Sequence, residues 1–195
     1  MRIIGGLAKG RRLSFKKTFL KVDSCPLRPT SAKVRKALFD ILRDRVVNSL
    51  FLDLYAGTGA VGIEALSRGA AFVVFIDESS VRVGAIKKMV FDLGFSQRVK
   101  VIKERAAIFV NKSSKTDIKP FDIIFVDPPY GSKELDEIIY LLGRGNLVSD
   151  NGVLIVEHSS KKTDMPLTTG CLKLLKQYHY GDTMLSLFIK NSVVN

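Results

Sequence analysis

The 195-residue chain is long enough for one compact domain, and its hydrophobic residues, 46% of the total, can fill a core. Charged residues make up 26% of the sequence, which is ordinary for a globular protein and excludes a chain that is disordered throughout. The net charge of +12 is not ordinary, and it indicates a polyanionic partner.

The excess positive charge lies near the N-terminus. Residues 1–50 contain thirteen Lys or Arg and three acidic residues, whereas the rest of the chain contains eighteen and sixteen. A localised basic surface attracts nucleic acid, which we expect as the partner. A membrane surface is the alternative, but neither a lipidation signal nor an amphipathic Trp/Lys helix supports it.

Cysteine and histidine are scarce and widely spaced. Cys25, Cys171, His158 and His179 show neither a zinc-site spacing nor a disulfide framework, and both histidines are interpreted as structural. No apolar run of the kind found in signal peptides follows Met1, and no stretch approaches transmembrane length. We expect a cytoplasmic monomer that binds no metal.

The predicted elements begin with a basic hairpin or extended arm over residues 1–24, where short apolar pieces alternate with glycines. Thr30 and Ser31 can cap a helix that runs to about Val46. Strands and helices then alternate, which predicts a parallel α/β sheet covered on both faces. The predicted strands are 50–55, 72–77, 99–103, 121–126 and 152–157, the helices are 57–68, 80–93 and 133–142, and strands 172–180 and 183–190 form a terminal antiparallel hairpin.

Glycines follow the first predicted strand, where ligands bind in such sheets. Gly57 and Gly59 allow a tight turn and close approach of the backbone to a ligand, and Gly62 lets the next helix pack near the strand. Taken alone, this pattern fits either a dinucleotide or a bound amino acid. Asp53, four residues before Gly57, would repel a pyrophosphate but suits the ammonium group of a methionine moiety. The combination therefore favours S-adenosylmethionine over NAD.

Asp77 closes the second predicted strand. A carboxylate at this position can accept hydrogen bonds from both ribose hydroxyls of an adenosine. Since NAD and S-adenosylmethionine both carry such a ribose, Asp77 indicates a nucleoside cofactor without choosing between them.

Asp127, Pro128, Pro129 and Tyr130 directly follow the buried fourth strand. The two prolines fix two φ angles and remove two N–H donors, so the loop presents acceptors: the Asp127 carboxylate and the Pro128 carbonyl. These acceptors suit an NH₂ group, and Tyr130 offers a face on which a base can stack. The loop therefore predicts methyl transfer to an exocyclic amine, with the cofactor supplying the reactive methyl group.

These motifs resemble the RsmD family of bacterial 16S rRNA guanine-N2 methyltransferases, and the resemblance covers nearly the whole chain. The N-terminal part carries the most specific matches. The matching segments are Arg2–Gly6, Gly10–Leu13, Leu27–Thr30, Val34-Arg35, Leu38-Phe39, Asp53–Gly62, Glu64–Ala70, Asp127–Tyr130 and Tyr180–Thr183.

The resemblance implies a class I S-adenosylmethionine-dependent methyltransferase fold, Rossmann-like, with a mostly parallel seven-stranded sheet, a C-terminal antiparallel hairpin and a small N-terminal β-hairpin extension. Residues 1–26 would form a basic arm for RNA, and residues 27–195 the methyltransferase domain. The substrate would be N2 of one guanine of 16S rRNA, in an assembled or assembling small ribosomal subunit.

The resemblance also implies roles for individual residues. Asp53, Gly57, Gly59 and Asp77 would bind the cofactor; Asp127, Pro128 and Tyr130 would hold the guanine; Arg11, Arg12, Arg28 and Arg35 would contact phosphates.

This chain departs from the family pattern at two positions. Ser79 stands where the family often has a polar or acidic residue, and Glu104-Arg105-Ala106 stands where an Asp or Asn commonly meets the cofactor adenine. If the register slides by one residue, Glu104 takes that role.

Three alternatives remain open. An adenine N6 methyltransferase acting on DNA or RNA would use the same Asp-Pro-Pro-Tyr loop, and the residues alone do not separate adenine N6 from guanine N2. An NAD-dependent oxidoreductase leaves Asp53, the Asp127 loop and the basic arm unexplained. A nucleic-acid-binding module without catalysis leaves the intact Asp127 loop unexplained.

Overall fold

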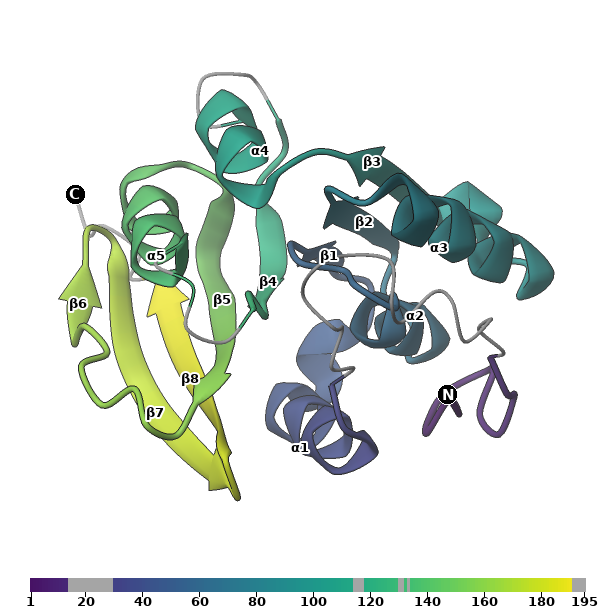
Figure 1. Ribbon diagram of the computed structural model, residues 1–195, viewed down its shortest axis with the longest axis horizontal. Helices are drawn as coiled ribbons and strands as arrows, with labels where there is room; N and C mark the ends of the chain where they lie inside the picture. The colour runs from purple at the N-terminus through teal and green to yellow at the C-terminus, as the bar shows by residue number, and fades with distance from the viewer. Residues whose placement is uncertain (14–29, 114–117, 130–131, 133, 191–195) are drawn as a thin grey trace.

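The computed structural model describes residues 1–13, 30–113, 118–129, 132 and 134–190. Within them lies one eight-stranded sheet with the order β3-β2-β1-β4-β5-β8-β7-β6 (Figure 1). The parallel strands are β1 (Leu50–Asp53), β2 (Phe72–Asp77), β3 (Val99–Lys103), β4 (Phe121–Val126) and β5 (Val148–Ser159). The antiparallel strands are β6 (Thr168–Thr169), β7 (Leu172–Tyr180) and β8 (Thr183–Lys190).

Helices cover both faces of the sheet, as the alternating pattern predicts (Figure 1). One face packs against α1 (Ala32–Leu42), α2 (Ala60–Ser67) and α3 (Ser80–Asp92). The other packs against α4 (Ala106–Ser113) and α5 (Glu134–Arg144). Two short 3₁₀ turns, η2 (Arg43–Val46) and η3 (Ser96–Arg98), complete the assignment.

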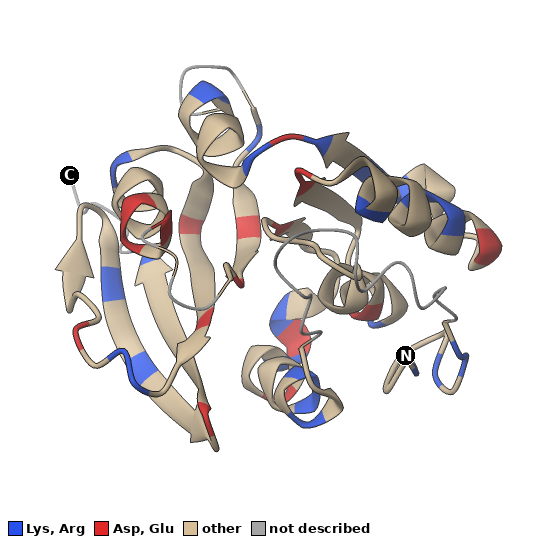
Figure 2. Cartoon of the chain, in the orientation of Figure 1, with Lys and Arg blue, Asp and Glu red and all other residues tan. Residues whose placement is uncertain are grey.

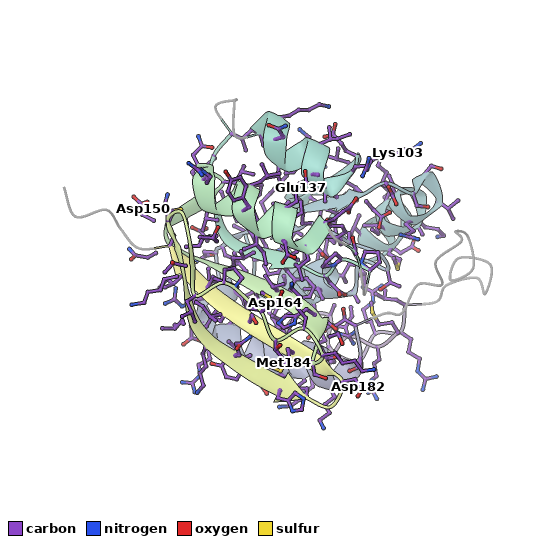
Figure 3. All side chains as sticks on the ribbon, turned by 60° about the vertical axis from the view of Figure 1, so that its left-hand side comes forward. Lys103, Glu137, Asp150, Asp164, Asp182 and Met184 are labelled. Carbon is purple, nitrogen blue, oxygen red and sulfur yellow. The ribbon has the colours of Figure 1, made fainter. Side chains whose placement is uncertain are left out.

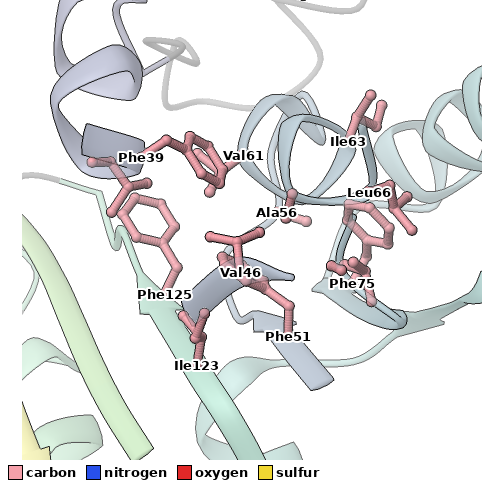
Figure 4. Close-up of a cluster of buried hydrophobic side chains, with 14 of the residues drawn as sticks. Phe39, Val46, Phe51, Ala56, Val61, Ile63, Leu66, Phe75, Ile123 and Phe125 are labelled. Carbon is pink, nitrogen blue, oxygen red and sulfur yellow. The ribbon is translucent and has the colours of Figure 1, made fainter. Parts of the chain in front are cut away.

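The α1–α3 face contains a core of aromatic and branched side chains (Figure 4). Phe51, Phe75 and Phe125 come from three neighbouring strands and are fully buried. α2 lies close to β2 because residue 62 is glycine: a Cβ built there would be 2.2 Å from Phe75 Cε1. The predicted role of Gly62 in close helix–strand packing is confirmed, but the side chain it makes room for belongs to β2 and not to the preceding strand β1.

Local signals explain the ends of two helices. Ser31 Oγ accepts a hydrogen bond from the Val34 amide at 3.1 Å, so the predicted cap of α1 is confirmed. Gly59 precedes α2 with φ of +71°, a left-handed conformation that glycine adopts without strain. The tight turn after β1 therefore depends on glycine, as predicted.

The N-terminal residues pack onto α2. Residues 1–13 fold back on themselves, with one antiparallel bridge between Arg2 and Arg12, and bury Ile3, Ala8 and Leu13. The predicted hairpin is thus reduced to a single bridge in the part described, and residues 14–29, including the rest of the predicted arm, lie outside it.

Two further elements differ from the prediction. The sheet has eight strands instead of seven, because the two-residue β6 adds to the edge of β7. α4 was not predicted, since its eight residues have neither a clear cap nor enough turns to show helical periodicity. Among the described residues, no helix is long and apolar enough to span a membrane.

Candidate active site

A cavity of about 440 Å³ opens at the carboxyl ends of the parallel strands. It lies where the strand order reverses, between β1 and β4, which is the usual ligand position in open α/β sheets. Its lining is rich in carboxylates. They are Asp53, Asp77, Glu78, Glu104, Asp127, Glu134, Glu157 and Asp182. The cavity therefore suits a ligand that carries positive charge and many hydrogen-bond donors.

Asp53, the last residue of β1, is bound to the start of α2. Its Oδ2 accepts a hydrogen bond from the Gly62 amide at 2.9 Å, and the residue is 1% exposed. Burial raises the pKa of Asp53 to about 7; the Gly62 hydrogen bond opposes this shift, and the Asp127 and Asp77 charges add to it. The chain's own carboxylate thus takes the anion position at this helix N-terminus. That arrangement is unfavourable for a pyrophosphate and favourable for an ammonium group.

Asp77, the last residue of β2, orders the loop beside it. Its Oδ2 accepts from the Gly57 amide at 2.9 Å, and its Oδ1 accepts from the Ser79 amide at 2.8 Å. Arg82 Nη1 lies 3.5 Å from Oδ1. Burial raises the pKa of Asp77 despite these contacts. The carboxylate is held in the cavity wall next to Gly57, where the sequence predicts the cofactor ribose.

Glu104 follows β3 and also lines the cavity, and its side chain is paired with Lys112 of α4. The next residue, Arg105, donates to Glu134 at 2.8 Å. The structure therefore brings Glu104 to the predicted cofactor end of the cavity, while its role with an adenine stays a prediction.

Asp127 follows β4, and Pro128 is buried beside it. Thr30 Oγ1 donates to Asp127 Oδ2 at 3.2 Å, so the residue before the Ser31 cap of α1 contacts the predicted catalytic carboxylate. Burial raises the pKa of Asp127 well above its ordinary value, and the neighbouring Glu157 charge raises it further. Tyr130, the third predicted substrate contact, lies outside the described residues.

The hairpin turn between β7 and β8 closes the same end of the cavity. Tyr180, Asp182 and Thr183 line it there, and Figure 3 shows Asp182 close to Met184 at this turn. The Asp127 loop and the β7–β8 turn, far apart in the sequence, therefore line the same cavity.

Sequence reasoning did not assign Thr30 and Glu157 to the site. The sequence places Thr30 in a helix cap and in the Leu27–Thr30 segment that matches the family, but in neither case at the site. Glu157 carries the same signal as Asp53, Asp77 and Asp127, an acidic residue at the end of a buried strand, and could have been found by it.

One predicted phosphate contact needs correction. Arg35 is 3% exposed; its Nη2 donates to the Arg2 carbonyl at 2.8 Å, and its Nε lies 3.7 Å from Glu64 Oε2. It is an internal link between α1, α2 and the N-terminal residues, so it cannot reach RNA in this structure.

The other predicted phosphate contacts differ in placement. Arg11 and Arg12 are exposed, and Arg11 Nη2 donates to the Asp92 carbonyl at 2.9 Å. Arg28 lies outside the described residues.

The sheet order, the glycine turn and the carboxylates at the strand ends define a class I Rossmann-like methyltransferase fold. A solved structure titled as a putative methyltransferase, yhhF, from Escherichia coli superposes with a TM-score of 0.82 at 30% identity, covering 98% of both chains. The structure of SMU.776, titled as a putative methyltransferase complexed with SAH, shares the fold at 12% identity, with a TM-score of 0.61 over 77% of this chain and 48% of that one.

The sequence comparisons give the family. The family model described as "Conserved hypothetical protein 95" matches residues 1–189. The Ribosomal RNA small subunit methyltransferase D of Escherichia coli strain K12 is 36% identical over 96% of this chain and 89% of its own length. The chain belongs to this family, the RsmD family, and is an rRNA methyltransferase.

Proposed function

We propose that this protein transfers a methyl group from S-adenosylmethionine to the N2 amine of one guanine in 16S rRNA. The observation that carries the proposal is the position of Asp127. Its carboxylate, on a loop stiffened by Pro128 and Pro129, shares one cavity with Asp53 and Asp77. The cavity can therefore hold the target amine, which accepts the methyl group, beside the sulfonium cofactor, which donates it.

The described residues at one end of the cavity fit the cofactor. Asp53 offers a carboxylate to the methionine ammonium group, and Asp77 offers acceptors to the ribose hydroxyls. Gly57 and Gly59, with φ of +52° and +71°, carry no side chains of their own, so a ligand can approach the loop backbone closely at these two positions. When bound, the cofactor supplies an electrophilic methyl group on a positively charged sulfur.

At the other end, the Asp127 carboxylate and the Pro128 carbonyl accept hydrogen bonds from the two hydrogens of the base amine. This contact fixes the nitrogen and favours the geometry in which its lone pair points at the methyl group. With the cofactor's methyl group supplied in exchange for its sulfur–carbon bond, the amine would gain a bond to carbon and would have one proton to release. The Asp127 carboxylate is the acceptor for it, since its raised pKa suits a group that takes up a proton.

Other parts of the proposal rest on the sequence and the relatives. The relatives' names specify the small-subunit rRNA, and we extend this to an assembled or assembling subunit as substrate and a monomeric enzyme. Arg11 and Arg12 would contact phosphates near the target, and Tyr130 would stack on the guanine.

The experiment is methylation of small subunits from a strain that lacks the gene, with the modified nucleotide mapped by mass spectrometry. We expect one N2-methylguanine in 16S rRNA. Asp127→Ala should abolish transfer and leave cofactor binding nearly unchanged, whereas Asp150→Ala, at the other end of β5, should leave both unchanged. An N6-methyladenine product would replace the guanine proposal with the adenine alternative, and loss of cofactor binding without loss of fold would contradict the role of Asp127.

A further inference from the structure

Glu157 and Asp127 are neighbours at the carboxyl ends of adjacent strands. β4 and β5 pair in parallel with Val126 opposite Val156, so the next residue of each strand is an acid. Because side chains alternate along a strand, both point to the face that holds α1 and α2. Both line the cavity, and Glu157 is 4% exposed.

Two carboxylates side by side in one half-closed cavity repel each other, so they favour a ligand that donates hydrogens to them. The Glu157 charge helps to raise the pKa of Asp127, which is the expected result of two like charges in contact with little water. Thr30 donates one hydrogen bond to Asp127, and Asp53 adds a third carboxylate in the same row. A ligand edge made only of N–H donors would relieve this repulsion.

We propose that Glu157 recognises the base by accepting the N1–H of guanine while Asp127 holds the adjacent N2 amine. The proposal rests on the proposed function, because it takes the guanine amine as the group that reaches Asp127. Guanine presents N1–H beside its amine, whereas adenine presents N1 as an acceptor beside its amine. Glu157 would therefore face a donor in guanine and a lone pair in adenine, and the two carboxylates together select guanine.

The test uses small subunits reconstituted with 16S rRNA in which the mapped target guanine is replaced by 2-aminopurine. This base keeps the 2-amino group but has a lone pair in place of N1–H. We expect wild-type kcat/KM to be about 10- to 100-fold lower on 2-aminopurine than on guanine. Glu157→Gln should bring the two values within about threefold, since an amide can donate to N1 or accept from N1–H.

Glu137→Gln is the matched control, because Glu137 is an exposed residue of α5 that does not line the cavity. It should keep the wild-type ratio. Glu157→Asp retains a carboxylate and should retain the preference at a lower rate. The proposal would be overturned if the wild-type ratio of kcat/KM on guanine to that on 2-aminopurine were near one, or if a folded Glu157→Gln protein kept the wild-type ratio. In either case, methylation of the guanine substrate would still support the proposed function.

A second observation concerns a basic groove between α1 and β7, with a volume of about 710 Å³. Figure 2 shows Lys and Arg on both of these elements. Four basic side chains, Lys33, Lys36, Arg43 and Lys176, line it, with one acidic side chain, Asp40, which pairs with Lys36 at 2.6 Å. The groove is therefore positively charged.

The groove also leads to the active site. Lys33 and Tyr180 line both the groove and the cavity, so the two hollows meet at these residues. Tyr178 and Tyr180 are half-buried in the groove, and Lys176 Nζ lies 5.1 Å from the centre of the Tyr178 ring. We infer that this groove, defined by α1 and β7, holds the single-stranded RNA next to the target nucleotide, with phosphates on the lysines and bases on the tyrosines.

The test is the salt dependence of 16S rRNA fragment binding by the full chain. Lys33→Gln with Lys176→Gln should weaken binding about 10-fold and lower the slope of log affinity against log salt by roughly one to two. The matched control is Lys100→Gln with Lys119→Gln, since Lys100 lies on β3 at the far edge of the sheet. If both double variants weakened RNA binding equally, the lysines would act by general charge attraction and the inference would be overturned. An unchanged slope of log affinity against log salt in the Lys33/Lys176 variant would also overturn it.

Discussion

Thr30 and Asp127, 97 positions apart in the chain, are joined by a hydrogen bond of 3.2 Å between the Thr30 hydroxyl and the Asp127 carboxylate. The contact ties the residue before the Ser31 cap of α1 to the loop after β4, so the N-terminal part of the chain helps to orient the carboxylate at the centre of the proposed reaction. Thr30 is a positioning residue, because it acts through Asp127.

Thr30→Val should lower kcat about 10- to 100-fold and leave the KM for the cofactor nearly unchanged, since a hydrogen bond to a charged group contributes roughly 1.5–3 kcal/mol. Thr30→Ser keeps the hydroxyl and should restore most of the rate. The measurement is methyl transfer to small subunits under saturating cofactor. A Thr30→Ser protein as slow as Thr30→Val would show that the hydroxyl alone does not sustain the rate, which would contradict the positioning role of the hydrogen bond.

Much of the site could be predicted because its residues follow strands whose apolar runs are easy to recognise. Asp53, Asp77 and Asp127 each end such a run, and parallel strands bring their carboxyl ends to one edge. The same rule applies to Glu157, which was overlooked because no familiar motif surrounds it.

Arg35 shows what the pattern could not reveal. α1 is covered on two sides, by the sheet and by the N-terminal residues, and no local signal in residues 30–46 shows that residues 1–13 return to pack there. A residue that looks exposed on a one-sided helix is thus buried. The short α4 and β6 escaped prediction for a related reason, since tertiary contacts stabilise elements too short to have a clear sequence period.

The raised pKa of Asp53 predicts how stability depends on pH without cofactor. Because the folded pKa is about 7 and the ordinary value is 3.8, the folded state holds this proton between those values while the unfolded state has lost it. Stability should therefore fall as pH rises from about 4 to about 7, with up to about 1.4 kcal/mol per pH unit from this residue. The measurement is urea unfolding at a series of pH values across this range. The free energy of unfolding should change less with pH in Asp53→Asn than in the wild type, and the Asn amide oxygen can still accept the hydrogen bond from Gly62.

Cofactor binding should reverse this linkage. An ammonium group beside Asp53 favours the ionised carboxylate, so binding should release protons near pH 7 and tighten as pH rises. Calorimetry in two buffers of different ionisation enthalpy measures the number released. We expect Asp53→Asn to bind more weakly and release fewer protons; the same release in both proteins would show that Asp53 does not meet the ammonium group.

Glu64 is a buried carboxylate that holds the N-terminal residues on α2. It accepts hydrogen bonds from the Ile4 and Gly5 amides at 2.9 and 2.7 Å, and it pairs with Arg68 at 2.9 Å. Glu64→Gln leaves the buried Arg35 without a negative partner and should lower the free energy of unfolding by about 3–5 kcal/mol. Urea denaturation measures it, and Glu137→Gln on the surface should change stability by less than about 0.5 kcal/mol.

Gly62 and Gly84 should respond to alanine in opposite directions. A methyl group at Gly62 would meet the buried Phe75 ring at 2.2 Å, so Gly62→Ala should destabilise the protein by about 1–3 kcal/mol. Gly84, inside α3, has nothing within 4 Å of an added Cβ, so Gly84→Ala should stabilise it by about 0.5–1 kcal/mol. Thermal unfolding measures both changes in stability, which should have opposite signs. A Gly62→Ala protein as stable as the wild type would refute the close packing of α2 on β2.

Arg11 and Arg12 are the predicted phosphate contacts that remain exposed in the described part of the chain. Replacing both with alanine should weaken rRNA binding and lower the slope of log affinity against log salt by about two, because each lost phosphate contact releases about one counterion fewer. The matched control is Arg45→Ala with Arg144→Ala, which removes the same charge from two other exposed arginines. Melting temperature should be measured alongside, because Arg11 also donates to the Asp92 carbonyl. An unchanged slope in a folded protein would mean that the two arginines do not contact phosphate and that their charge acts only at long range.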